Sequence, residues 1–323
     1  MEYVPMSDPI DTSIVIPVYN SAEIFPLLYE QLVATLERAV DSFEIIAVVD
    51  GCADNSAEVV AQHSEKDSRV KLIEFSRNFG NQMAITAGLQ ASRGDMVVVM
   101  DDDLEDPPDV IPRLIQKAEE GYEVVYAVRK KRDISAIRHA LYKTYYRVLN
   151  KFSSFEIPED VGDFCLMRRP IVDVLNSMPE NNRYIRGLRA WAGFSQAGVE
   201  FDRQARHSGI SGFDLSRYFS FAFDGIFSFS YKPLVYVTFI GFVISISSLA
   251  LALILIFLKL TARLPDVPGW TSIAVSVLFI GGIQLLSIGV VGQYVGRIYD
   301  EVKQRPSFII KRSIGLDDGT DPD

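Results

Sequence analysis

Cysteine and histidine are scarce in this sequence, and their scarcity excludes several kinds of site. The 323 residues include two cysteines, Cys52 and Cys165, and three histidines. Two cysteines provide no disulfide framework and no Cys-x-x-Cys pair for zinc or redox chemistry, which fits a reducing compartment. Because a histidine cluster is also excluded, we expect any metal to be a hard cation, magnesium or manganese, held by carboxylate oxygens.

The N-terminus lacks the pattern of a secretory signal. Residues 1–11 carry three acidic residues, no basic residue and no apolar core, whereas a signal peptide starts with a basic segment and continues with an apolar one. We therefore expect the N-terminal part of the chain to stay on the side of the membrane where it is made. The total length suggests about two domains.

Charge is distributed unevenly along the chain. The 32 basic and 42 acidic residues give a net charge of −10, but residues 1–128 alone hold 8 basic and 24 acidic residues. Residues 129–151 hold eight basic residues and one acidic residue. This basic stretch has two interpretations, a solvated helix face or a face turned toward phosphates or an anionic lipid leaflet.

Two long uncharged runs lie near the C-terminus. One covers residues 234–258, the other covers residues 270–296, and a link with two prolines separates them. At 1.5 Å per residue each run exceeds the roughly 30 Å of a bilayer's hydrocarbon core. The runs predict a transmembrane hairpin with helices over about 234–258 and 270–295. Helices buried in a soluble core are the alternative, disfavoured because two such runs follow one another.

The residues that flank the runs predict the orientation of the hairpin. Two crossings place residues 1–232 and the tail from residue 297 on one side. Six basic residues flank the runs on that side, against Lys259 and Arg263 in the link; these six are Lys232, Arg297, Lys303, Arg305, Lys311 and Arg312. The positive-inside rule then predicts a multi-pass protein of the inner (plasma) membrane with a cytoplasmic N-terminal domain and a cytoplasmic tail.

Two further segments have the composition of a membrane interface. Residues 213–231 contain eight aromatic residues among 19, a density typical of the bilayer interface. Residues 134–152 place apolar side chains at steps of three and four, which predicts an amphipathic helix. That helix lies either at the bilayer interface or against the core of the domain.

The first 128 residues alternate between apolar runs and helical patterns. The runs at 13–18, 43–49, 70–75, 96–100 and 124–128 are separated by the helical stretches 27–40, 57–63, 82–91 and 110–120. This βαβαβαβαβ order predicts a mainly parallel sheet covered by helices, with ligands beyond the carboxyl ends of the strands.

Two of these strand ends carry hydrogen-bond acceptors. The first strand ends in PVYN at 17–20 and the second in DGCADN at 50–55. Asp50 can accept a hydrogen bond from a nucleobase or a ribose hydroxyl, and Gly51 lets the backbone come close to a ligand. The alternative is an ordinary turn.

The fourth strand end is strongly acidic. Residues 101–108 read DDDLEDPP, and side chains alternate along an extended chain, so Asp101, Asp103 and Glu105 are expected to face one side. Carboxylates so close raise one another's pKa unless a cation lies among them. This favours a divalent metal site over the alternative, a solvated acidic loop that caps a helix.

Five motifs in this order resemble those of the polyprenyl-phosphate glycosyltransferases of glycosyltransferase family 2. They are VIPVYN at 15–20, DGCAD at 50–54, SRNFG at 76–80, DDDLEDPP at 101–108 and GDF at 162–164. With the two C-terminal runs, the resemblance covers nearly the whole chain. It is to the branch of bactoprenol glucosyltransferases of the GtrB type, with dolichyl-phosphate mannose synthases as more distant relatives.

The resemblance implies both an architecture and a reaction. It implies a GT-A (Rossmann-like) α/β domain at 1–212, an interfacial segment at 213–232, two transmembrane helices within 233–296 and a cytoplasmic tail at 297–323. The reaction is inverting transfer of a sugar from a nucleotide-sugar, here a UDP-sugar, to undecaprenyl phosphate for the cell envelope, with Mg²⁺ or Mn²⁺. The implied partners are the donor, the lipid phosphate, the bilayer and an optional second copy of the chain, without nucleic acid.

The resemblance implies roles for the residues of this sequence that match the motifs of the family. The role of Asp163 stays open between orienting the acceptor, positioning the metal and assisting deprotonation. We expect Arg203 and Arg206 to hold the acceptor phosphate, with Arg129 and residues 130–132 as further candidates for either phosphate. The expected nucleotide-sugar contacts are Pro17, Tyr19, Asp50, Arg77, Asp101 and Asp102; the expected metal ligands are Asp101, Asp103 and Glu105; the expected catalytic residues are Asp103, Asp163, Arg203 and Arg206.

The sequence departs from the family pattern at two positions near the expected acceptor site. Cys165 and Gly212 stand where the family often has a basic residue, so two cations are missing. An inactive membrane-tethered protein that binds nucleotide-sugars, or a scaffold, is therefore an alternative. A processive polysaccharide synthase is disfavoured because the chain has no Gln-x-x-Arg-Trp motif.

Overall fold

The computed structural model describes residues 10–129, 161–181, 183–201, 232–261 and 269–316. It consists of two compact units, and the boundary between them follows the change from alternating strands and helices to long apolar helices. The amphipathic segment at 134–152 and the aromatic segment at 213–231 lie outside the described residues.

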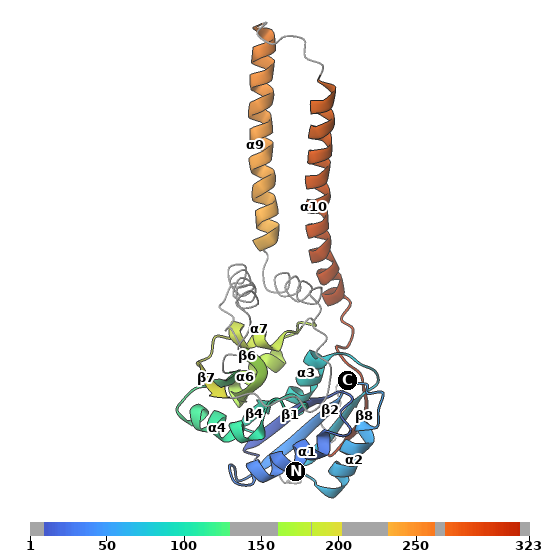
Figure 1. Ribbon diagram of the computed structural model, residues 1–323, viewed down its shortest axis with the longest axis vertical. Coiled ribbons are helices and arrows are strands. Elements are labelled where there is room, and N and C mark those ends of the chain that lie inside the picture. The colour runs from blue at the N-terminus through green and yellow to red at the C-terminus, as the bar shows by residue number, and fades with distance from the viewer. Residues whose placement is uncertain (1–9, 130–160, 182, 202–231, 262–268, 317–323) are drawn as a thin grey trace, which may run out of the picture. The chain divides into compact units, whose positions relative to one another are not determined.

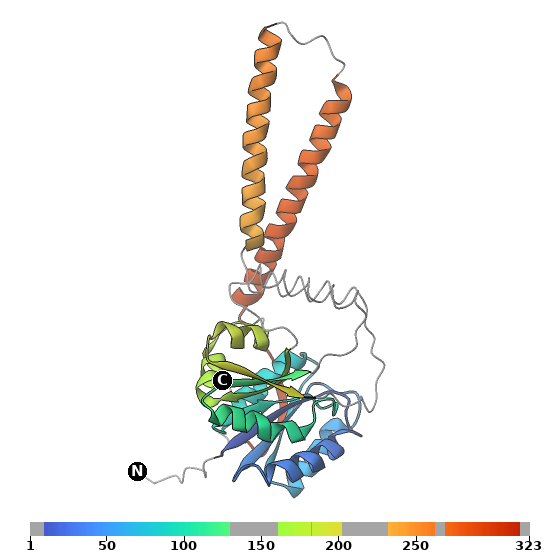
Figure 2. The same ribbon diagram turned by 60° about the vertical axis from the view of Figure 1, so that its left-hand side comes forward.

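The first unit is built on one eight-stranded sheet with helices on both sides (Figures 1 and 2). The strand order is β7-β5-β6-β4-β1-β2-β3-β8, so β1 lies near the middle. The strands are β1 (Thr12–Val18), β2 (Phe43–Val49), β3 (Val70–Phe75), β4 (Met96–Val99), β5 (Val124–Arg129), β6 (Val161–Arg168), β7 (Gln196–Phe201) and β8 (Ile310–Ile314).

The direction of the strands confirms the predicted mainly parallel sheet. Neighbours β4, β1, β2 and β3 run parallel, as do β5 and β7. Strand β6 lies antiparallel between β4 and β5, and β8 is antiparallel at the edge beside β3. The central strands are buried along their whole length, which explains why they read as continuous apolar runs rather than alternating ones.

Each predicted helix of the first 128 residues is present within a few residues of its expected ends. Helices α1, α2 and α4 bury their apolar positions in one cluster with the strands, and α3 packs into a second cluster on Ile46, Val48 and Phe75. The helices are α1 (Phe25–Leu36), α2 (Ser56–Lys66), α3 (Asn81–Ala91), η1 (Pro108–Val110), α4 (Ile111–Glu119), α6 (Arg169–Ser177) and α7 (Ile185–Trp191).

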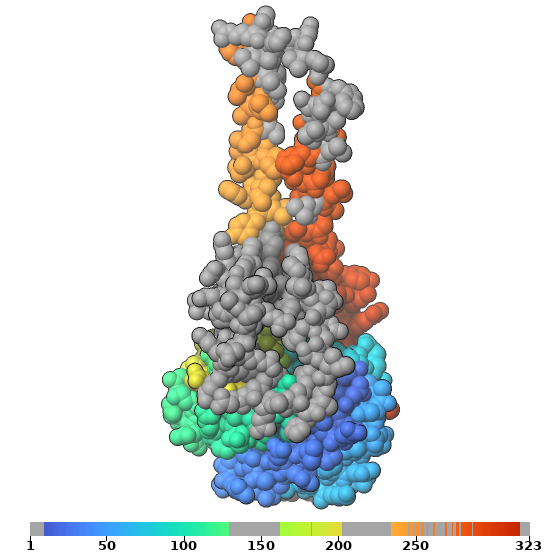
Figure 3. Space-filling model, viewed as in Figure 1, coloured from blue at the N-terminus to red at the C-terminus, as the bar shows by residue number. Residues whose placement is uncertain are grey.

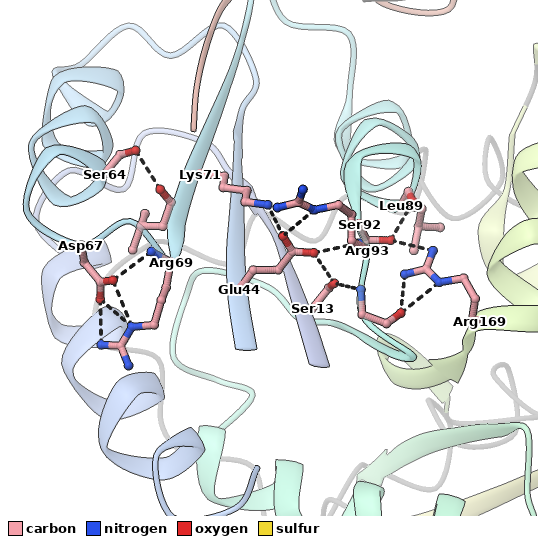
Figure 4. A network of polar contacts seen from close by, with 12 residues as sticks. Ser13, Glu44, Ser64, Asp67, Arg69, Lys71, Leu89, Ser92, Arg93 and Arg169 are labelled. Carbon is pink, nitrogen blue, oxygen red and sulfur yellow. Dashed lines mark hydrogen bonds and ion pairs between the residues drawn. The ribbon is translucent and has the colours of Figure 1, made fainter. Parts of the chain in front are cut away.

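A network of buried charges lies at the amino ends of the strands (Figure 4). Glu44, 1% exposed, forms an ion pair with Lys71 of the next strand. Its carboxylate also accepts hydrogen bonds from the Ser13 hydroxyl at 2.5 Å and the Arg93 amide at 2.8 Å. Because each charge has a partner, this end of the sheet is stabilised internally.

The second unit contains two long helices, α9 (Lys232–Leu260) and α10 (Trp270–Val302). Their 29 and 33 residues cover the two uncharged runs at 234–258 and 270–296. Many of their large apolar side chains, such as Phe239 and Leu285, are more than half exposed. Figure 3 draws the described side chains of these two helices in orange and red. Within the described residues one segment, Phe279–Val302, is both long and apolar enough to cross a membrane.

Candidate active site

The carboxyl ends of β1, β2 and β4 bring three loops together, because these strands are parallel neighbours. The Tyr19 amide donates to Asp102 Oδ2 at 3.0 Å. The Asn20 side chain, at a residue with φ of 53°, accepts from the Ala53 amide at 2.9 Å. The three strand ends singled out in the sequence therefore form one continuous surface.

Asp50 ties the end of β2 to the loop after β3. Its carboxylate is 3% exposed and accepts hydrogen bonds from the amides of Phe79 at 2.6 Å and Gly80 at 2.8 Å. Gly51, at φ of 60°, lies so close to this loop that a Cβ would be 2.2 Å from the Asn78 nitrogen. Glycine is thus required here. The structure gives Asp50 a role that the sequence did not reveal, as an anchor for residues 76–80.

The expected nucleotide contacts differ in exposure. Tyr19 is 54% exposed. Arg77 is also exposed, and its guanidinium carbon lies 3.9 Å from the centre of the Phe79 ring. Pro17 is buried inside β1, paired with Val48. Tyr19 and Arg77 can therefore reach a ligand with their side chains, whereas the ring of Pro17 lies in the interior of the sheet.

The acidic loop after β4 turns tightly. Asp103 accepts a hydrogen bond from the Glu105 amide at 3.0 Å, and Leu104 is buried with φ of 58°. Glu105 and Asp106 are almost fully buried, at 5% and 1% exposed. A buried leucine in the left-handed region is uncommon and costs energy that the surrounding structure must supply. The loop consequently fixes several carboxylates in a small volume.

The pKa of Asp101 is raised by its burial within this arrangement of carboxylates. Burial raises its pKa to about 7, and the negative charges of Asp163, Asp106, Asp103 and Asp102 add to the increase. These neighbouring charges all act in the same direction, against ionisation of the Asp101 carboxyl. The loop therefore attracts a positive charge.

Asp102 differs from Asp101 in its contacts. Burial raises its pKa as well, while hydrogen bonds from Ser21 and the Tyr19 amide oppose the increase. Its carboxylate is thus already used to hold the loop after β1.

Asp163 on β6 has the opposite electrostatic environment. Burial raises its pKa, but the charge and hydrogen bonds of Arg186 outweigh that effect, and Arg189 and Gln82 add to it, so the pKa is below the ordinary value. Arg186 binds both carboxylate oxygens, at 2.7 and 3.1 Å. The Gln82 side chain donates a hydrogen bond from Nε2 to the Asp163 carboxylate at 3.4 Å, and its amide oxygen accepts one from the Ile185 amide. Asp163 is therefore held as a carboxylate.

The sequence analysis missed Gln82, Arg186 and Arg189. Arg186 and Arg189 are three residues apart on α7, so they lie on one face of that helix. Arg189 is 2% exposed and close enough to lower the pKa of the Cys165 thiol, which burial raises. A cation from α7 thus lies beside the position where the sequence lacks one. In the sequence, the available signal was the pair of arginines at helical spacing. No feature of the nearby sequence connects that pair with Asp163.

The expected metal ligands are close in sequence without forming a closed ligand set. Among the residues that the structure describes, no group of three or more His, Cys, Asp or Glu side chains is arranged to hold a metal ion. A magnesium ion needs only one or two carboxylates when phosphates and water complete its shell. The raised pKa of Asp101 fits such an open site. Arg203 and Arg206 lie outside the described residues.

Comparisons with known proteins agree with the motifs. The model of the family described as "Glycosyl transferase family 2" matches residues 13–175. The chain is 41% identical over 313 residues to "Uncharacterized glycosyltransferase YkcC" of Bacillus subtilis (strain 168), covering 97% of both chains. It is 40% identical over 303 residues to the "SfII prophage-derived bactoprenol glucosyl transferase" of Shigella flexneri, covering 93% of this chain and 97% of the relative.

A solved structure with a similar course is the mannosyltransferase PcManGT from Pyrobaculum calidifontis in complex with GDP-Man and Mn²⁺. It is 14% identical with a TM-score of 0.47, and the match covers 92% of this chain and 88% of that chain.

Proposed function

The chain belongs to glycosyltransferase family 2, and we propose that it transfers a sugar from a UDP-sugar to a polyprenyl phosphate with inversion at the anomeric carbon. Support comes from relatives that are named bactoprenol glucosyl transferases and match over 93% of this chain. Their name makes glucose the first sugar to test. The first unit supplies the Rossmann-like α/β domain expected of this family.

The observation that carries the proposal is the cluster around Asp101. Burial, together with neighbouring carboxylates, raises the pKa of Asp101 to about 7, and this residue follows the carboxyl end of a parallel strand, where ligands of such sheets bind. Asp101 and Asp103 would hold a magnesium or manganese ion, with Glu105 as a further candidate ligand. That ion would neutralise charge on the diphosphate of the donor as it leaves.

The acceptor needs little activation. A phosphate monoester with a second pKa near 6 is largely dianionic at neutral pH, so its oxygen attacks the anomeric carbon directly. The bond between that carbon and the nucleoside diphosphate breaks, and the diphosphate leaves with the electron pair. Because Asp163 is held as a carboxylate by Arg186, we assign it to orienting the acceptor side of the site.

The remaining residues divide between donor and acceptor. Tyr19, just after β1, and Arg77, within the loop that Asp50 anchors, are both exposed, which favours contact with the nucleotide. We keep Arg203 and Arg206 as contacts of the lipid phosphate, on the strength of the family resemblance. Removing one charge-assisted phosphate contact should cost roughly 1.5–3 kcal/mol, or about 10- to 150-fold in acceptor use.

We propose that the chain crosses the membrane twice, and the pairing of β8 with β3 supports an even number of crossings. Strand β8 pairs with β3, so residues 310–314 and 70–75 lie on one side of any membrane, and the chain between them crosses an even number of times. If Phe279–Val302 of α10 crosses, α9 with its uncharged residues 234–258 is the natural second crossing. The positive-inside rule places the first unit in the cytoplasm.

The reaction can be tested by mass spectrometry of lipids. The full chain is incubated in vesicles with undecaprenyl phosphate, Mn²⁺ and separately UDP-glucose, UDP-galactose or GDP-mannose. A lipid-linked hexose should form, should require the metal, and should be lost in Asp101→Asn. Asp109→Asn, the same change at an exposed residue just beyond the loop, serves as the matched control. Donor binding without any lipid product would favour the inactive alternative.

A further inference from the structure

The segment after α10 is built into the sheet of the first unit. Strand β8 pairs with β3, and Lys311 and Arg312 both bind the carboxylate of Glu74, at 2.5 and 2.9 Å. Phe308 and Ile310 pack against the apolar cluster that also contains Phe75 and α3. Residues 297–323, expected from the sequence to be a tail, therefore include a structural strand (Figure 1).

A line of stacked side chains leads from this segment to the candidate donor site. The Phe308 ring stacks on Phe75 with centroids 5.0 Å apart and planes 17° apart. Phe75 meets the edge of Phe79 at 5.6 Å and 85°. Phe79 in turn lies under the guanidinium of Arg77 at 3.9 Å. Each contact in the line has the geometry of a favourable aromatic or cation–π pair.

The backbone of the same loop is fixed at both ends. The Ser76 amide donates to the carbonyl of Ile309 at 3.0 Å, which attaches the start of the loop to the segment before β8. The amides of Phe79 and Gly80 donate to Asp50 at its end. Between these attachments the chain has one exposed cation, Arg77, whose side chain rests on Phe79.

We propose that Phe308 is a positioning residue for Arg77, so that the segment following α10 completes the donor-binding surface. The proposal rests on the donor role proposed for Arg77 above. The contact of Phe308 with Phe75 fixes Phe79, and Phe79 fixes the guanidinium where it meets the diphosphate of the donor. A nucleoside diphosphate is the ligand class that this cation recognises.

The expected loss of donor affinity follows from the entropy cost of immobilising the Arg77 side chain when the donor binds. A long side chain that must be immobilised when the ligand binds lowers affinity, whereas one already held does not. Losing the support of Phe308 should therefore weaken donor binding by about 3- to 10-fold. The Km for the lipid phosphate should stay within about twofold, because the stack reaches only the donor side of the site.

The experiment measures binding of UDP-glucose with Mn²⁺ by calorimetry, using the full chain in detergent. Phe308→Ala should weaken binding by the stated factor, and Phe308→Leu, which keeps apolar volume and loses the flat ring, should do so without a large change in melting temperature. Ile314→Ala is the matched control, because this β8 residue packs against the other apolar cluster and should leave donor affinity within about twofold.

A double-mutant cycle separates positioning from general destabilisation. In an Arg77→Ala background, Phe308→Ala should have less than about a twofold effect, since the group that it positions is gone. An equal effect in both backgrounds, or equal effects of Phe308→Ala and Ile314→Ala, would overturn the proposal. So would unchanged binding in Phe308→Ala and Phe308→Leu while the wild type binds. A wild type that binds neither UDP-glucose nor GDP-mannose would instead overturn the proposed function itself.

Discussion

Replacing Arg186 by alanine removes the main cation that holds Asp163 ionised. In the wild type Arg186 makes two hydrogen bonds to the buried carboxylate, at 2.7 and 3.1 Å, and the pKa of Asp163 lies below its ordinary value. Hydrogen bonds to a charged group contribute about 1.5–3 kcal/mol. We expect the variant to lose about this much stability at neutral pH, and Arg186→Lys to lose less.

Asp101 indicates what happens to a carboxyl in this cluster when burial and negative neighbours dominate. Its pKa is raised to about 7. Without Arg186, burial raises the pKa of Asp163 and its own neighbour Asp101 adds negative charge. The pKa of Asp163 should therefore be higher in the variant than in the wild type, so that a larger share of this carboxyl is protonated at a given pH.

The sign of the pH effect follows from these directions. A carboxyl with a lowered pKa stabilises the folded wild type above the ordinary Asp pKa, and that contribution disappears as pH falls through the folded-state value. In the variant the raised pKa disfavours the folded state above pH 4. The difference in stability should thus be largest near pH 7 and should shrink toward pH 4.

Two measurements test this reasoning. Thermal unfolding of wild type and Arg186→Ala between pH 4 and 8 gives the stability difference, and the pH dependence of sugar transfer gives the ionisation of the site. The acid limb of the variant should move to higher pH, and in an Asp163→Asn background Arg186→Ala should have little further effect. An acid limb that stays in place, or a stability difference that is constant with pH, would refute the pairing.

Three other changes test the site and its scaffold. Asp101→Asn should reduce transfer by at least about 100-fold, with EDTA giving the same loss, because the leaving diphosphate loses its counter-charge; full activity in EDTA-treated membranes would contradict this. Gly51→Ala should lower the free energy of unfolding by about 2–4 kcal/mol, since the new Cβ meets backbone at a positive φ; an unchanged melting temperature would disprove the close approach. Glu44→Ala should cost about 3–5 kcal/mol, because it leaves Lys71 charged and buried, and replacing both residues by methionine should restore much of that loss in thermal unfolding.

The local pattern of apolar and polar residues was sufficient to predict the central part of the fold. The first five strands and the helices between them were predictable because the strands are short, mainly apolar runs, and β1, β2 and β3 are buried along their whole length. The acidic loop at 101–106 was predictable as a site because it follows directly on such a run. The position of β6 was not predictable, since its insertion between β4 and β5 depends on pairing over long sequence distances.

The same limit applies to charges that act at a distance in sequence. Lys311 and Arg312 read as basic residues flanking a membrane helix, yet in the structure both bind Glu74, more than two hundred residues earlier. Arg186 was not singled out from the sequence, yet it is the main group that lowers the pKa of Asp163. The sequence of a segment gives the sign of its net charge, but it does not identify the oppositely charged residue with which the segment pairs.

The two ends of the sheet differ in whether their buried carboxylates have a cationic partner within the chain. At the amino ends, Glu44 meets Lys71 within the chain, so that end needs no further cation. At the carboxyl ends, Asp163 meets Arg186, but the neighbours of Asp101 all raise its pKa. The first arrangement stabilises the fold, and the second leaves negative charge that a divalent cation can neutralise when a diphosphate binds. The polarity of the parallel sheet therefore separates a structural end from a reactive end within one small unit.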